Sequence, residues 1–577
     1  MKSFLQFIPI LQWLPNYKKA HLSGDLSAGL TVGIMLIPQG MAYAMLAGLP
    51  PVFGLYASLI PQVIYALLGT SRQLSVAPVA MDSLLVAAGL GALSLSGIEE
   101  YTSMAIFLAL FMGSIQFLLG IVKMGFLVNF LSKPVISGFT SAAALIIGLS
   151  QLKHLLGAPI ENSNQIHILL GNTVEVLDQI NIYAIVLGVA AILIIKAIKR
   201  WVPKIPAALV VTILGIVITY AFNLSEYGLN IVKVVPSGLP KVGLPELSLD
   251  RLNDLTPIAV TLALIAFMEA ISVAKAIEER KGLQEVRPNQ ELIAIGMANI
   301  VGSIFQSYPV TGGFSRTAVN DQAGASTPLS SIISAIIVGL TLLFLTPLFY
   351  HLPKTVLAAI IMVAVFGLID FAYPVRLLRK RKDEFAILVI TFLTTLTIGI
   401  TEGIILGVLI SLGLMIYRTS QPHYAILGRI KDSTHYRNVK RFDKEVSIDP
   451  EVLFFRFDGQ LYFGNKDYFK TELTQAVESH GSELKGIVLS VEAINYIDST
   501  AAHMLRQLFS QFEERGIKVT ISGPIGPIRD ILKRSEIVDL IGKQSFFDNA
   551  HDAFLFIKGD ENKIDEYSRR IALESKE

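Results

Sequence analysis

The sequence predicts a polytopic α-helical membrane protein followed by a small soluble α/β domain. Hydrophobic residues make up 52% of the 577 residues, and charged residues make up only 16%, whereas soluble domains usually contain roughly 25% charged residues. Long apolar runs recur from Leu26 to Tyr417, and the composition changes to that of a soluble protein after Arg418. Most of the chain therefore belongs in a lipid bilayer.

The apolar runs predict about fourteen membrane spans, because a bilayer core requires about 20 apolar residues per helix. The segment 1–25 contains no small-residue cleavage site and is expected to remain as a cytoplasmic N-terminal segment. The expected spans are 26–47, 52–69, 78–93, 103–121, 126–149, 182–198, 205–222, 256–277, 291–305, 313–325, 328–349, 354–371, 384–400 and 402–418.

Lysine and arginine predict that both termini are cytoplasmic, because the dense basic clusters all fall on one side of the membrane. An extracytoplasmic loop, 223–255, divides the membrane part into repeat 1 (26–222) and repeat 2 (256–418). Each repeat holds about seven spans, and an odd number reverses the orientation of the second repeat. Inverted repeats of this kind are typical of secondary transporters.

The third span of each repeat lies in a short segment that is broken at its start by a proline, Pro78 or Pro309. Both segments, SVAPVAMDSLLVAAGLGAL and SYPVTGGFSRTAVNDQAG, carry polar residues at membrane depth. Broken helices in corresponding positions of two repeats indicate a substrate site, because their N-terminal amides face an anion. For either segment alone, a proline kink in an ordinary helix is the alternative interpretation.

The C-terminal part alternates between strand-like and helical patterns. VLFFRF, GIVLSV and KVTISG are typical of strands, and the segments between and after them are typical of helices. We expect a linker at 419–435, a soluble α/β domain at 436–560 and a tail at 561–577.

Composition also excludes several functions. A net charge of +2 gives no electrostatic field strong enough to indicate nucleic acid as a partner. The absence of cysteine excludes disulfides, thiolate metal sites and cysteine nucleophiles. The nine histidines are scattered, and no nucleophile–base pair or metal cluster stands out. We therefore expect neither an enzyme nor a bound metal or cofactor.

The segment Pro51–Ser58, PVFGLYAS, is followed by LIPQVIYALLGTSR through Arg72. It resembles the signature of the sulfate permease (SulP) family of anion transporters, with Phe53 where tyrosine is usual. The similarity runs from LIPQGMAYAMLAGLPP in the first span to a C-terminal domain that resembles the sulfate transporter and anti-sigma-factor antagonist (STAS) type. Prestin and pendrin are animal relatives. The resemblance implies seven plus seven inverted spans, a core domain that moves against a gate domain, and a homodimer.

The resemblance also implies which residues bind the anion. Gln39 and Tyr43 lie four residues apart on one face of the first span, at positions where the family has a glutamine and an aromatic residue beside the anion. A helix–helix hydrogen bond and an interfacial aromatic residue are the alternative roles. Val79 occupies a place where prestin-like relatives have phenylalanine, so we expect a roomier or differently lined pocket here.

The second broken segment combines backbone amides at Gly313 and Phe314, the Ser315 hydroxyl and the positive charge of Arg316. We expect Ser315 to donate to a substrate oxygen and Arg316 to attract the anion. An arginine at membrane depth costs about 2.5–3.5 kcal/mol on insertion scales, so it faces a cavity or a partner. The alternative is a structural ion pair between Arg316 and a carboxylate, either Asp82 or Glu269.

Glu269 lies inside the eighth expected span, where an ionisable group indicates a function. We expect it to take up and release a proton. Sodium-coupled bicarbonate relatives resemble this segment but have an aspartate, with a threonine one turn later. Here Val273 offers no side-chain oxygen, and only Ser272 could substitute. Protons are therefore favoured over sodium, and Asp82 is a possible auxiliary charge.

Ser499 matches the phosphorylated serine of anti-sigma-factor antagonists, at the start of a predicted helix. A plain helix N-cap is the alternative role. We expect this surface to bind a cytoplasmic regulatory partner and to have no catalytic activity.

The expected function is proton-coupled uptake of sulfate by alternating access in a cell membrane, which is the plasma membrane or a bacterial inner membrane. Sodium-coupled uptake of bicarbonate or a dicarboxylate is the alternative among transporters. An uncoupled anion channel or a voltage-responsive protein is the alternative of another class, although broken half-helices favour one central, alternately exposed site.

Overall fold

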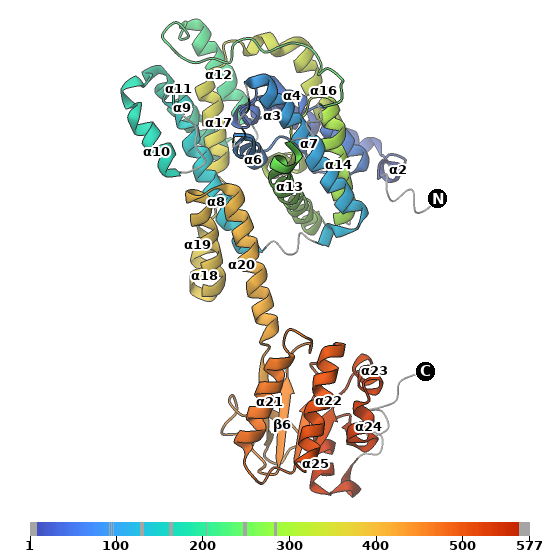
Figure 1. Cartoon of the computed structure of the whole chain (residues 1–577). Helices are drawn as coiled ribbons and strands as arrows, with labels where there is room; N and C mark the ends of the chain where they lie inside the picture. Colours follow the sequence, from blue (N-terminus) through green and yellow to red (C-terminus); the bar gives the residue numbers. More distant parts are fainter. Residues whose placement is uncertain are drawn as a thin grey trace. The chain divides into compact units, whose positions relative to one another are not determined.

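A computed structural model describes residues 9–91, 93, 95, 97–126, 132–160, 166–202, 205–245, 251–281, 286–367 and 369–564 (Figure 1). These residues form two compact units, which divide between Ser411 and Leu412. The boundary lies inside helix α20 (Ile400–Ser420). The first unit is almost entirely helical, and the second is an α/β domain.

The helices of the first unit overlap the expected spans, of which residues 92, 127–131 and 368 lie outside the described residues. Repeat 1 contains α3 (Lys19–Leu46), α4 (Val52–Tyr56), α5 (Ile60–Leu68), α6 (Ala80–Gly91), α7 (Ile98–Ile121), α8 (Lys133–Ser150), α11 (Ile182–Trp201) and α12 (Ala207–Ala221). Repeat 2 contains α13 (Leu252–Lys281), α14 (Pro288–Ile304), α15 (Phe314–Gln322), α16 (Leu329–Leu340), α17 (Lys354–Phe366), α19 (Lys382–Thr397) and α20. The shorter helices are α2 (Ile10–Trp13), α9 (Leu152–Leu155), α10 (Ile166–Glu175) and α18 (Ala372–Lys380).

Within the described residues, seven helices are individually long and apolar enough to cross a membrane. One expected span, 52–69, is not continuous, because it is split into α4 and α5. Pro61 lies in the first turn of α5. Proline lacks an amide hydrogen and its ring clashes with the carbonyl four residues earlier, which here is that of Ala57, so it favours a break between α4 and α5. Helix α16 extends to Phe349 through a π-helical and a 3₁₀ turn.

Two half-helices, α6 and α15, are too short to cross a bilayer, with 12 and 9 residues. Each follows a two-residue strand, β1 (Val76–Ala77) or β2 (Thr311–Gly312). The strands pair antiparallel, with Ala77 opposite Thr311. This pairing brings the starts of both half-helices together from distant parts of the sequence, and it confirms the two broken segments predicted above.

Helices α7 and α14 approach each other closely because glycines lie at their contact. A Cβ atom added to Gly113 would lie 2.7 Å from the carbonyl oxygen of Gly296, and one added to Gly296 would lie 2.6 Å from the amide nitrogen of Phe117. Small residues allow such approaches in membranes, where packing rather than water exclusion holds helices together.

The second unit is built on a sheet with strand order β4-β3-β6-β7-β8-β9, and β5 pairs with β3. Strands β6 to β9 are parallel, whereas β3 is antiparallel to β4, β5 and β6. The strands are β3 (Tyr424–Ile430), β4 (Tyr436–Asn438), β5 (Val446–Ser447), β6 (Val452–Phe457), β7 (Gly486–Ser490), β8 (Lys518–Ser522) and β9 (Phe546–Phe547). The expected linker 419–435 is therefore wrong in part, because it contains β3.

Helices cover both faces of this sheet. Successive side chains of a strand point to opposite faces, and β6 places apolar side chains on both of them. Leu453 and Phe455 of β6 pack with residues of α21, α22, α23 and α24, whereas Val452 and Phe454 pack on the opposite face with Ala553 of α25. The helices are α21 (Lys466–His480), α22 (Ser499–Glu514), α23 (Gly526–Arg534), α24 (Ile537–Ile541) and α25 (Ala550–Lys558).

Candidate anion-binding site

Arg316 lies where the two half-helices begin, and its side chain is 1% exposed. Its Nη1 donates to the carbonyl oxygen of Pro78 over 2.6 Å, and its Nη2 donates to that of Ala77 over 3.0 Å. Within the described residues, no ion pair joins Arg316 to Asp82 or Glu269. The guanidinium of α15 is thus bonded to the backbone that leads into α6, rather than to a carboxylate.

Gly313 lies against both this guanidinium and Val79. A Cβ atom at Gly313 would lie 2.7 Å from Nη2 of Arg316 and 3.1 Å from Cγ1 of Val79, so a side chain at this position would force the guanidinium to shift. Phe314 and Ser315 follow in the first turn of α15, and both are exposed. The Ser315 hydroxyl has no hydrogen-bond partner among the described residues and is therefore available to a ligand.

Gln39 and Tyr43 lie on α3, four residues apart, and both are buried. The Gln39 Oε1 atom has no hydrogen-bond partner in the part of the chain that the structure describes. Tyr43 lies within electrostatic reach of both Arg316 and Glu269. The structure therefore brings the first span, the second broken segment and the eighth span close together.

The two membrane carboxylates differ in their surroundings. Asp82 lies in the first turn of α6 and is completely buried, and neither of its oxygens has a hydrogen-bond partner among the described residues. Glu269 of α13 is half-buried. Each carboxylate lies within electrostatic reach of the other, and Glu269 also lies within reach of Arg316.

Several polar residues that were not expected from the sequence form hydrogen bonds between the elements of the site. Backbone groups at membrane depth must find partners inside the protein. The Thr311 hydroxyl donates to the carbonyl oxygen of Ala266 on α13 over 2.6 Å, and the Thr317 hydroxyl accepts from the Ser75 amide over 3.0 Å. Polar residues inside otherwise apolar spans were the available signal for these positions.

A second group of polar contacts lies on the N-terminal side of β2. The side chain of Asn299 on α14 accepts from the amide of Val310 over 2.9 Å and donates to its carbonyl oxygen over 3.0 Å. The hydroxyls of Ser83 and Tyr308 lie 3.1 Å apart. These bonds attach the extended segment to both α14 and α6.

In the second unit, Asp498 rather than Ser499 is the N-cap of α22. The Asp498 side chain accepts from the amide of Ala501 over 2.8 Å and from that of Phe463 over 2.8 Å. Aspartate is an effective cap because its oxygen satisfies an amide of the first turn. Ser499 is therefore not needed as a cap, and it is exposed at the first helical residue.

The geometry suits an anion better than a metal. The N-terminal ends of α6 and α15 and the charge of Arg316 all favour negative charge, and Gln39, Tyr43 and Ser315 supply polar groups. The described residues contain no group of three histidine, aspartate or glutamate side chains placed to hold a metal ion.

A buried charge between two half-helices, in a multi-pass membrane unit followed by a separate α/β unit, is the architecture of a membrane transporter with an attached soluble domain. Comparison with known families identifies the transporter. Residues 22–391 match the sulfate permease family, and residues 443–553 match the STAS domain. The chain belongs to the sulfate permease family, which confirms the resemblance found in the sequence.

The similarity to individual proteins extends over nearly the whole chain. Sulfate transporter 4.1, chloroplastic, of Arabidopsis thaliana is 38% identical over 564 residues, covering 94% of this chain and 82% of the relative. High affinity sulfate transporter 2 of Stylosanthes hamata is 33% identical over 572 residues, covering 95% and 86%. The murine Solute Carrier 26 family member A9 anion transporter, solved in the inward-facing state, is 26% identical, with a TM-score of 0.89 and coverage of 97% and 95%.

Proposed function

We propose that the protein takes up sulfate together with protons by alternating access. The observation that carries this proposal is the meeting of two half-helix N-termini at the buried Arg316, beside the available hydroxyl of Ser315. A tetrahedral dianion suits such a set of convergent donors and positive dipoles. The relatives named as sulfate transporters favour sulfate over other small anions.

In this proposal, Arg316 acts on the anion through its charge and through the N–H groups that the backbone leaves free. Nη1 and Nη2 each donate to one carbonyl, of Pro78 and Ala77, whereas Nε has no hydrogen-bond partner among the described residues. The other direct anion contacts come from Ser315, Gln39, Tyr43 and the amides of α15. The bonds of Arg316 keep those amides in place, which lowers the reorganisation that binding requires.

Glu269 is the proposed proton carrier. It lies one turn beyond Ala266, whose carbonyl binds the Thr311 hydroxyl of β2, and within electrostatic reach of Arg316. An ionised Glu269 offsets the positive charge that attracts the anion, whereas a protonated Glu269 does not. Proton binding and anion binding therefore favour each other, as linkage requires. Asp82 is the auxiliary carboxylate of this arrangement.

Reconstitution into liposomes tests the coupling. Glu269→Gln keeps the shape and removes the titration, so it should retain exchange of internal for external sulfate but lose accumulation driven by an inward proton gradient. Glu226→Gln, an exposed residue between α12 and α13, is the matched control and should accumulate sulfate normally. If Glu269→Gln still concentrates sulfate under a pH gradient alone, the carrier is another group.

We further propose a homodimer in a cell membrane with both termini in the cytoplasm, and regulation through the STAS unit around Ser499. Light-scattering mass measurement in detergent tests the dimer, and labelling of engineered cysteines from each side tests the orientation. Ser499→Asp should change the transport rate while leaving sulfate affinity unaltered. A chain that ends after Thr419 should still bind sulfate, and loss of binding by this folded, truncated chain would contradict the proposal.

A further inference from the structure

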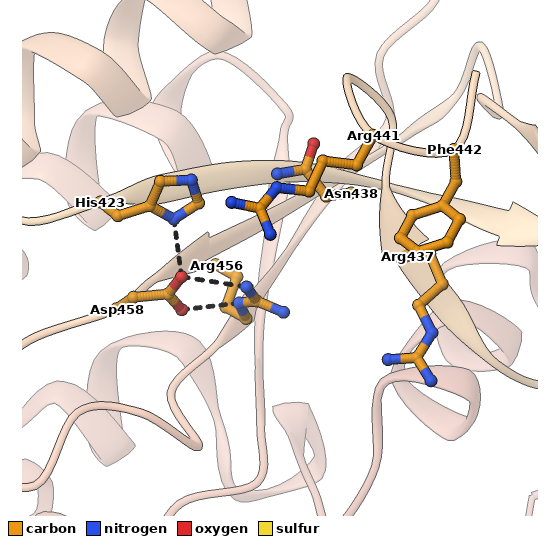
Figure 2. Close-up of a pocket in the computed structure, with 7 residues that line it drawn as sticks. All are labelled: His423, Arg437, Asn438, Arg441, Phe442, Arg456 and Asp458. Carbon is orange, nitrogen blue, oxygen red and sulfur yellow. Dashed lines mark hydrogen bonds and ion pairs between the residues drawn. The ribbon is translucent and has the colours of Figure 1, made fainter. Parts of the chain in front are cut away.

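The second unit contains a basic pocket at the β4–β3–β6 side of its sheet, with a volume of about 260 Å³. Its residues come from three neighbouring strands and the turn after β4 (Figure 2). His423 precedes β3, Asn438 ends β4, Arg441 lies in the turn, and Arg456 and Asp458 lie at the end of β6. None of these residues belongs to the membrane site.

One side of the pocket is a fixed ionic group. Arg456 donates to both oxygens of Asp458, with distances of 2.6 Å from Nε and 2.9 Å from Nη2, and Nδ1 of His423 lies 2.8 Å from the same carboxylate. Partial burial opposes the charge of Asp458, but the bonds from Arg456 and His423 lower its pKa. Asp458 is therefore ionised at neutral pH, and Glu492 also lies within electrostatic reach of Arg456.

The other side carries guanidinium groups that no residue of the described chain neutralises. Arg437 and Arg441 are exposed and have neither an ion pair nor a side-chain hydrogen bond among the described residues. The Asn438 carbonyl accepts the amides of Arg441 and Phe442, which fixes the turn. Figure 2 shows Arg441 extending across the pocket toward Asp458, while Arg437 extends past Phe442 and away from that pair.

Charge and size together define the ligand class. Three arginines and one carboxylate line the pocket, so its lining has excess positive charge. Guanidinium groups match the oxygens of phosphate and sulfate with paired donors. The volume is below the roughly 300–1,000 Å³ of pockets for drug-sized molecules, which favours a single oxyanion group. The partly exposed ring of Phe442 offers an apolar contact to whatever the oxyanion is attached to.

We propose that this pocket binds a phosphate or sulfate group between Arg441 and Arg456, as a second anion site distinct from the membrane site. The group can come from a free inorganic anion or from a phosphate ester such as a lipid headgroup. Asn438 supplies a neutral amide beside Arg441, and Arg437 adds positive charge at the rim. Asp458 orients Arg456 and at the same time limits affinity, because it opposes the incoming negative charge.

Hydrogen–deuterium exchange of the full-length chain at constant ionic strength tests the site locally. Inorganic phosphate, glycerol phosphate, and vesicles with or without a phosphoinositide are the three probes. Protection of residues 436–447 by inorganic phosphate indicates a free anion as the ligand. Protection by glycerol phosphate but not by inorganic phosphate indicates a soluble ester. Protection only by phosphoinositide vesicles indicates a lipid headgroup. No protection by any probe overturns the proposal.

Variants give the decisive signs. Arg441→Gln should weaken binding of the protecting probe by about tenfold or more, because a hydrogen bond to a charged group contributes about 1.5–3 kcal/mol. Asp458→Asn should strengthen binding of that probe. Arg515→Gln, which removes an exposed arginine elsewhere in the unit, should leave its binding unchanged. Equal binding by Arg441→Gln, or weaker binding by Asp458→Asn, would reject the site. Arg316→Ala should leave this protection intact, which separates the pocket from the membrane site.

Discussion

Replacing Arg316 tests whether its contacts with the backbone carry substantial free energy. The guanidinium donates to the carbonyls of Pro78 and Ala77 over 2.6 and 3.0 Å in a buried position. A hydrogen bond to a charged group contributes about 1.5–3 kcal/mol. Arg316→Ala removes two such bonds and should lower the free energy of unfolding of the membrane unit by about 3–6 kcal/mol. Arg316→Lys keeps the charge but reaches only one carbonyl, and should cost about 1.5–3 kcal/mol.

Unfolding of purified protein in detergent measures the contribution of the two Arg316–carbonyl hydrogen bonds to stability. Equilibrium binding of radiolabelled sulfate measures the contribution of the Arg316 charge to anion affinity. We expect stability to fall in the order arginine, lysine, alanine, and we expect the alanine variant to lose sulfate binding while the lysine variant retains weakened binding. Arg379→Ala, which removes an exposed arginine of α18, is the control. An alanine variant as stable as the parent would refute the stabilising role of the Arg316–carbonyl hydrogen bonds. An alanine variant with unchanged sulfate affinity would place the anion elsewhere.

Two predictions concern the second unit. Asp498→Ala should destabilise it by about 1 kcal/mol, whereas Ser499→Ala should change its stability by less than about 0.5 kcal/mol, as measured by denaturant unfolding; equal effects would contradict the assignment of the cap. Hydrogen bonds from Lys485 and Lys558 lower the pKa of Glu451 from 4.5 to about 2. Because the pKa of Glu451 is lower in the folded state, its ionised form stabilises the fold above pH 4.5, and this stabilisation is lost as the pH falls toward 2. Glu451→Gln should therefore flatten this part of the acid-unfolding curve, and an unchanged curve would argue against the pairing.

The membrane spans could be predicted because the bilayer demands long apolar runs, which are a property of local sequence. The two half-helices were also visible locally, because Pro78 and Pro309 precede segments with polar residues. In the second unit, the strands β6, β7 and β8 were recognisable from runs such as VLFFRF, whereas β3 (Tyr424–Ile430) lies within the segment 419–435 that was expected to be a linker.

The contacts inside the candidate site could not be predicted, because they depend on pairing between distant segments. From the sequence, carboxylates were the expected structural partners of Arg316, but its partners are backbone carbonyls at the end of β1, which pairs with β2. Backbone acceptors leave no trace in composition. The alternative role of Ser499 as the N-cap of α22 falls to Asp498 instead, since both residue types are good caps and only the geometry selects between them.

The antiparallel pair β1–β2 has a mechanical consequence. The ladder, the guanidinium bridge and the Ser75–Thr317 bond connect α6 to α15 at their starting ends, so these half-helices resist being pulled apart. A rearrangement of the membrane unit then has to move α6 and α15 together past the neighbouring helices, so both halves of the candidate anion site would move as one piece. Engineered links between residues 76 and 312 should therefore be tolerated, and any link that immobilises the protein has to lie outside this joint.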